Sequence, residues 1–104
     1  MGLSSFMEQA RYHRAVEAEL ARTISAMDSV SGARVHLAIA KQSAFMRRGN
    51  EPSASVMVSL LPGVRLSERQ LSGIIHLVAS SIPNLDSDRV SVVDQAGKLL
   101  SSQG

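Results

Sequence analysis

The chain has no cysteine and no tryptophan, and its aromatic residues are one tyrosine and two phenylalanines. Without cysteine it can form neither a disulfide nor a thiolate metal site. So few rings cannot supply the row of stacking aromatics that a single-stranded nucleic-acid binder needs. With 44% apolar residues, the interior must instead be built from aliphatic side chains.

Strong charge of one sign and long apolar runs are also missing. The formal net charge of +2 is too small to imply a nucleic-acid partner. No run approaches the roughly 20 apolar residues of a membrane span, and the first residues do not resemble a signal peptide. We expect one domain over residues 1–104, with its core at about 5–100, a flexible tail at 101–104 and any membrane anchor elsewhere.

Two segments have the apolar period of an amphipathic helix. The first covers about residues 5–27, and its predicted buried stripe is Tyr12, Val16, Leu20, Thr23, Ile24 and Met27. The second begins at Ser67, where Gln70 completes a capping box, and ends before Pro83. Its predicted buried stripe is Leu71, Ile74, Ile75, Val78 and Ile82.

Three segments alternate with the period of a strand, at residues 33–39, 55–60 and 90–93, and residues 98–100 could add an edge pairing. The order helix, strand, strand, helix, strand predicts an α+β fold of KH-like topology, with both helices on one face of a three-stranded sheet. The other sheet face would carry small and partly apolar side chains: Arg34, His36, Ala38, Ser55, Met57, Ser59, Ser91 and Val93. Such a face is unusual for a surface left in water and favours contact with another molecule.

No group of side chains predicts catalysis, a cofactor or a metal site. His13, His36 and His76 fall on different elements, with no carboxylate or cysteine at ligand spacing. Residues 84–95 imitate a calcium loop but lack its glycine and its final glutamate. The sequence also lacks a glycine-rich phosphate loop, a nucleophile elbow and the G-x-x-G of nucleic-acid-binding KH domains.

Two further features admit either a contact or a solvated surface. The segment from Lys41 to Ser53 is longer than a hairpin needs, and its cations could grip an acidic surface or simply be hydrated. On the second helix, Gly73 is small and Leu77 is predicted to lie outside the buried stripe. Together they indicate a contact surface, or else a weak helix position beside one scattered apolar side chain.

Several blocks in order resemble the flagellar M-ring (MS-ring) protein family. They are YHRAVEAELARTI at 12–24, ARVHLA at 33–38, PSASV at 52–56, HLVASS at 76–81, and VVDQ at 92–95 followed by Gly97 and Leu99–Leu100. The resemblance implies the second periplasmic ring-building motif of such a protein, at the periplasmic face of the inner membrane in the flagellar basal body. The family usually has proline where this chain has Ala40, which makes the following loop less constrained.

The resemblance implies a structural ring-assembly module that is not an enzyme and that associates side by side with its own copies. It also implies neighbouring ring-building domains and flagellar rod or export components as partners, with transmembrane helices outside the chain and neither nucleic acid nor membrane bound by the chain itself. Alternatives are a ring module of a type III secretion system, a KH-like nucleic-acid binder, and a small-molecule or peptide-binding domain. The candidate interface is Arg34, His36, Ala38, Met57 and Val93 on the sheet with Arg22, Gly73 and Leu77 on the helices, and the candidate loop contacts are Lys41, Arg47 and Arg48.

Overall fold

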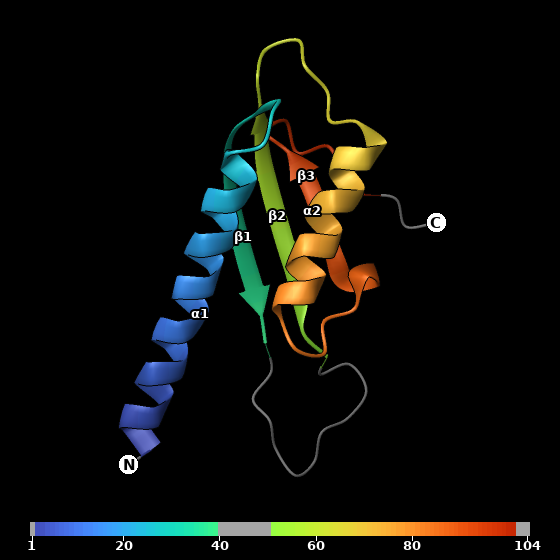
Figure 1. Ribbon diagram of the computed structural model, residues 1–104. Helices are drawn as coiled ribbons and strands as arrows, with labels where there is room; N and C mark the ends of the chain where they lie inside the picture. The colour runs from blue at the N-terminus through green and yellow to red at the C-terminus, as the bar shows by residue number, and fades with distance from the viewer. Residues whose placement is uncertain (1, 40–50, 102–104) are drawn as a thin grey trace.

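The computed structural model describes residues 2–39 and 51–101, and both helices lie on the same side of the sheet (Figure 1). The elements are α1 (Gly2–Ser25), β1 (Val30–Ala38), β2 (Ser53–Leu60), α2 (Glu68–Ser81), a 3-10 turn η1 (Ser87–Arg89) and β3 (Val90–Asp94). The predicted α+β class and the layering of two helices over three strands are confirmed.

The strand order in the sheet is β1-β2-β3, with β2 at the centre. β1 and β2 run antiparallel, with Val35 opposite Val56. β2 and β3 run parallel, with Val56 beside Val92, because α2 lies between them in the chain and carries it back across the sheet. An isolated antiparallel bridge between Val93 and Leu99 adds the expected short pairing at the β3 edge.

The core lies between the helices and the inner face of the sheet, and it is entirely aliphatic. Its fully buried side chains include Ile24 of α1, Ile74 and Val78 of α2, and Val58 and Val92 of the sheet, each with no exposed surface. These positions follow the periods read from the sequence, 3.6 residues in the helices and two in the strands. Burial of this kind stabilises each large side chain by about 1.5–3 kcal/mol.

Outside the candidate interface, three expectations about individual side chains differ from the structure. Tyr12 was expected in the buried stripe of α1 but is 63% exposed, because the helix runs past the sheet and Val16 is the first described apolar residue to pack against the core (Figure 1). Thr23 is exposed, and its hydroxyl donates to the carbonyl of Glu19 at 3.0 Å. Ser101 was expected in a flexible tail but is buried, and residues 102–104 lie outside the described residues.

The capping box predicted for α2 is present and also joins two parts of the fold. Ser67 Oγ accepts a hydrogen bond from the Gln70 backbone N–H, and Gln70 Oε1 accepts one from the Ser67 N–H, each at 3.1 Å. The same glutamine donates through Nε2 to the carbonyl of Asp28 at 3.0 Å. One side chain therefore begins α2 and ties that end of the helix to the turn after α1.

Replacing Ser67 with alanine removes the side-chain acceptor of this cap. We expect Ser67→Ala to lower the free energy of unfolding by about 1 kcal/mol, measured by urea denaturation followed by circular dichroism. Ser72→Ala, at an exposed position inside the same helix, is the control and should be neutral or slightly stabilising. An equal loss in both variants would contradict the role assigned to the cap.

Candidate subunit interface

The sheet face away from the helices carries five of the eight candidate interface residues. The strand pleat turns Arg34, His36 and Ala38 of β1 to this side, and all three are exposed. The pairing register then sets Met57 of β2 opposite Arg34, with Val93 of β3 on the other side of Met57. The sequence therefore identified residues that the fold does bring together.

This outer face combines small polar side chains with a few apolar ones. Met57 is 41% exposed, an unusual environment for a methionine at the centre of a sheet. The neighbouring row along the strands pairs His36 with Ser55 and Ser55 with Ser91. Arg34 and His36 belong to the β1 edge, and at the β3 edge Ser91 and Leu99 line a depression together with Glu51, Asp86, Asp88 and Arg89, so the uncharged part of the face is its centre around Met57 and Val93.

Leu99 belongs to the same face, and sequence reasoning did not include it among the candidates. Its bridge to Val93 places the two side chains on the same side of the sheet, and Leu99 is 49% exposed. The adjacent Leu100 instead packs against the core. The alternation after the Gly97 turn was a usable signal, but the pattern alone does not say which of two consecutive leucines faces outward.

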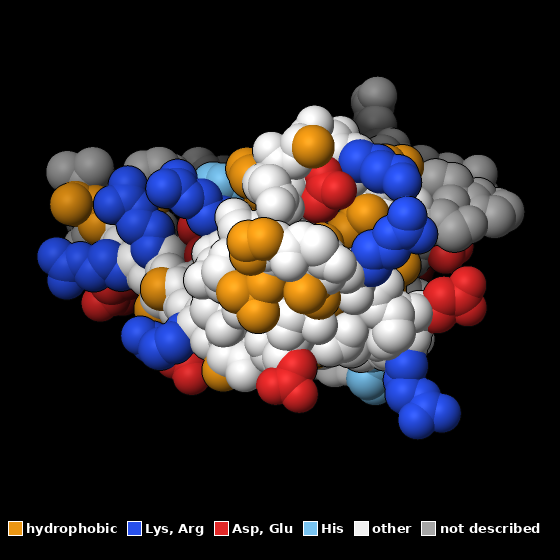
Figure 2. All heavy atoms as spheres, turned by 90° about the horizontal axis from the view of Figure 1, so that it is seen from above, with side chains coloured by type: hydrophobic (Ala, Val, Ile, Leu, Met, Phe, Trp, Pro, Cys, Tyr) orange, Lys and Arg blue, Asp and Glu red, His pale blue; other side chains and the backbone are white. Residues whose placement is uncertain are grey.

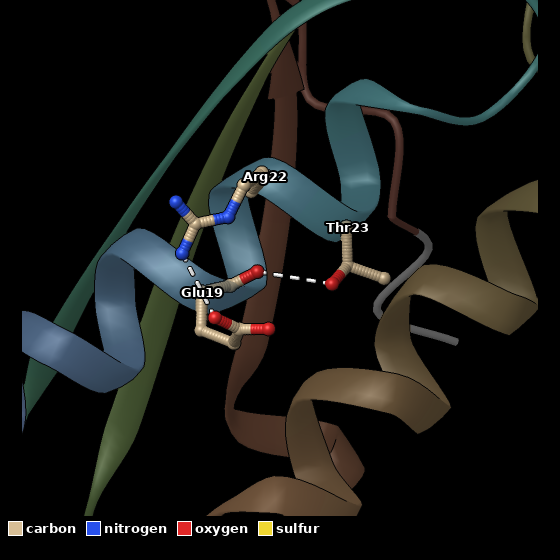
Figure 3. Close-up of polar contacts among 3 residues, drawn as sticks. All are labelled: Glu19, Arg22 and Thr23. Atoms are coloured by element: carbon tan, nitrogen blue, oxygen red, sulfur yellow. Dashed lines mark hydrogen bonds and ion pairs between the residues drawn. The ribbon is translucent and has the colours of Figure 1, made fainter.

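The other three candidates lie in the helix layer, on two separate helices. Arg22 of α1 is exposed and forms an ion pair with Glu19 of the same helix at 2.8 Å (Figure 3). Gly73 of α2 is exposed, and a Cβ added there would meet nothing within 4 Å. Leu77 is a correction: it is half-buried and packs against the core, because its position three residues after Ile74 is at the margin of the buried stripe.

A second exposed apolar group lies in the loop between β2 and α2. Viewed from above, this end of the molecule shows apolar side chains gathered near its centre (Figure 2). Leu61 is 44% exposed and Val64 36% exposed, and the loop is held by a hydrogen bond from the Leu61 N–H to the Ser29 carbonyl at 3.0 Å. This loop is at the end of the sheet, where Leu61 and Val64 line a depression together with Leu99.

The candidate loop contacts Lys41, Arg47 and Arg48, like Ala40, lie outside the described residues and stay predictions. Within residues 2–39 and 51–101, no three His, Asp or Glu side chains are grouped so that they could hold a metal ion. No helix in that part of the chain is long and apolar enough to cross a bilayer. In one open depression Arg89 pairs with Glu51 at 3.2 Å beside Asp86 and Asp88. A second depression, beside the loop after β2, has Arg65, Glu68, Asp94 and Lys98 in its lining.

The chain matches, over residues 1–101, the family described as "Secretory protein of YscJ/FliF RBM domain". It is 53% identical to the flagellar M-ring protein of Pseudomonas aeruginosa over 103 residues, which are 99% of this chain and 17% of the relative. It is 54% identical to the flagellar M-ring protein of Escherichia coli over 99 residues, 95% of this chain and 18% of that protein. The chain thus spans less than a fifth of the length of these curated relatives.

Two solved structures have a similar fold. A structure of the 58–213 fragment of FliF is 41% identical, with a TM-score of 0.75, over 86% of this chain and 58% of that one. The type III secretion system protein EscJ of enteropathogenic Escherichia coli is 26% identical, with a TM-score of 0.69, over 88% of this chain and 52% of that one.

The outer face should tolerate a charge that the core does not. We expect Met57→Glu to change the free energy of unfolding by no more than about 0.5 kcal/mol, since the new carboxylate stays in water. Val58→Glu, one residue further along β2 but with no exposed surface, should cost about 3 kcal/mol or more because the charge is buried without a partner. Urea denaturation of both variants measures the difference, and similar losses would mean that Met57 contributes to the core.

Proposed function

The chain belongs to the YscJ/FliF family of ring-building-motif domains, and from that premise we propose that it is a structural module of the flagellar MS ring. In this proposal it associates side by side with copies of itself and catalyses no reaction. The observation that carries the proposal is the outer sheet face, where Met57 is exposed at the centre of the sheet and none of the described helices covers it (Figure 1).

The two candidate patches lie on different layers of the molecule. One is the outer sheet face around Met57, and the other is the exposed side of the helix layer, including Gly73 on α2 and Arg22 on α1. A contact that joins two different patches is heterologous, so every copy keeps one free patch for the next copy. Repeated with a rotation that divides the full circle evenly and with no rise along the axis, such a contact closes into a ring.

Side-chain size and charge favour α2 as the main part of the helix patch. The β1 edge of the outer face carries Arg34, and the exposed side of α1 carries three cationic side chains, Arg11, Arg14 and Arg22, which would repel it. Around Gly73 the exposed side of α2 presents the small side chains of Ser72 and Ser80, with Arg69 one turn before Gly73 and His76 one turn after it. The sheet face of one copy therefore fits best over α2 of the next, with Arg22 and its partner Glu19 at the rim.

We place the module at the periplasmic face of the inner membrane, with other ring-building domains and rod or export components as its neighbours. The identity of 53–54% to flagellar M-ring proteins supports this location. A ring module of a type III secretion system is the second candidate, favoured by the likeness to EscJ but at 26% identity. The flagellar assignment is better supported because the identity to M-ring proteins is about twice as high.

Disulfide cross-linking tests the contact directly because this chain contains no cysteine. In the full-length protein that carries this sequence, with cysteines elsewhere replaced, we expect Met57→Cys with Gly73→Cys to give a ladder of covalent multimers on oxidation. The matched control pairs Met7→Cys, near the start of α1 and 51% exposed, with Gly73→Cys and should stay monomeric on a denaturing gel. Electron microscopy of the uncross-linked protein in detergent shows whether rings are present.

The two possible failures of this experiment are distinguishable. Rings that form without a ladder from the Met57 and Gly73 pair would mean that copies meet through other faces. An unmodified full-length protein that forms no rings under any membrane-mimetic condition would contradict the ring function itself.

A further inference from the structure

We propose that Met57, Val93 and Leu99 form one apolar ridge that a second copy of the chain covers, and that residues 98–101 are the element that completes the ridge. This inference rests on the proposed ring function and assigns Leu99, on the edge segment after β3, to the contact between copies.

The ridge follows from the pairing register across the sheet. Val93 lies beside Met57 on β3, and Leu99 lies opposite Val93 across the isolated bridge. Three apolar side chains therefore follow one another across the sheet, and the two largest, Met57 and Leu99, are 41% and 49% exposed. The row beside them contains Ser55 and Ser91, whose side chains are shorter than those of Met57 and Leu99.

The segment that carries Leu99 is firmly held to β3. The Leu100 N–H donates to the Val92 carbonyl at 2.7 Å, and the hydroxyl of the buried Ser101 accepts from the Val92 N–H at 3.2 Å. Before it, Asp94 Oδ1 accepts from the backbone N–H groups of Ala96 and Lys98, both at 2.9 Å. Leu99 is thus fixed before any partner arrives, which lowers the entropy cost of binding.

Continuity and charge both identify a second copy as the occupant. The ridge is part of the outer face that the ring contact uses, so a copy seated on Met57 also reaches Val93 and Leu99. The same row ends at Arg34, opposite Met57, where the exposed guanidinium complements a carboxylate. The α2 helix of a copy carries such a carboxylate in Glu68, which is exposed in its first turn.

Leu99→Glu in the full-length protein, purified in detergent and imaged by electron microscopy, tests the ridge. We expect the fraction of protein in rings to fall at least tenfold, because a carboxylate would be covered by an apolar contact. Met7→Glu is the matched control, since Met7 is also apolar and is 51% exposed but lies near the start of α1, in the helix layer. Its ring fraction should equal that of the unmodified protein.

A second variant keeps the test independent of any effect on folding. Leu99→Ala removes the end of the ridge without adding charge, and it should reduce the ring fraction severalfold while limited proteolysis gives an unchanged pattern. Rings that are lost in Met57→Glu but retained in both Leu99 variants would overturn the inference and leave the ring function standing. Intact rings that lose only a rod or export component would assign the ridge to another protein and also overturn it.

Discussion

The parallel pairing of β2 with β3 is the constraint on which the architecture depends. Two parallel strands cannot be joined by a tight turn, so the chain must cross from one end of the sheet to the other, and α2 makes that crossing. α2 crosses on the side where α1 already covers β1, and Ile74, Val78 and Ile24 fill the layer between helices and sheet (Figure 1). With both helices on one side, the described part of the chain has no helix for the other side. The bare sheet face is therefore a consequence of the topology.

The side chains of Gln95 and Asp94 hold the margin of the sheet beside that face. Gln95 accepts a hydrogen bond from the Leu60 N–H at 3.1 Å and donates to the Leu60 carbonyl at 3.3 Å, so its side chain continues the pairing of β2 beyond the end of β3. Asp94 caps the turn that returns the chain to the β3 edge. The sequence VVDQ thus combines a core residue, an outer-face residue and two polar residues that hold the sheet margin in place. A short motif that carries the family resemblance has a structural reason at every position.

The sequence predicted the fold well because the amphipathic periods were strong and the helix cap was explicit. It predicted the outer face for the same reason, since the alternation in β1 and β2 decides which residues share a side. Where it failed, the deciding fact was tertiary: Tyr12 is exposed because α1 is longer than the layer beneath it, and Leu77 is half-buried because the core reaches the margin of the α2 stripe. Leu99 was missed because its direction depends on an edge pairing that a two-leucine pattern does not specify. Lys41, Arg47 and Arg48 fall outside the described residues, so the structure does not bear on them.

A ring built on such a face requires only a weak contact between neighbours. A ridge of three apolar side chains is far smaller than the roughly 800 Å² per partner of a typical stable interface, so one pair of isolated modules should bind poorly. Short tethers raise the effective concentration of neighbouring modules to the order of mM, where a contact with a Kd of about 1 mM, or about 4 kcal/mol, is already half occupied. In a closed ring each copy contacts two neighbours, so a copy that leaves the ring loses both contacts. An exposed ridge of this size is therefore sufficient for assembly once tethers hold the copies close together.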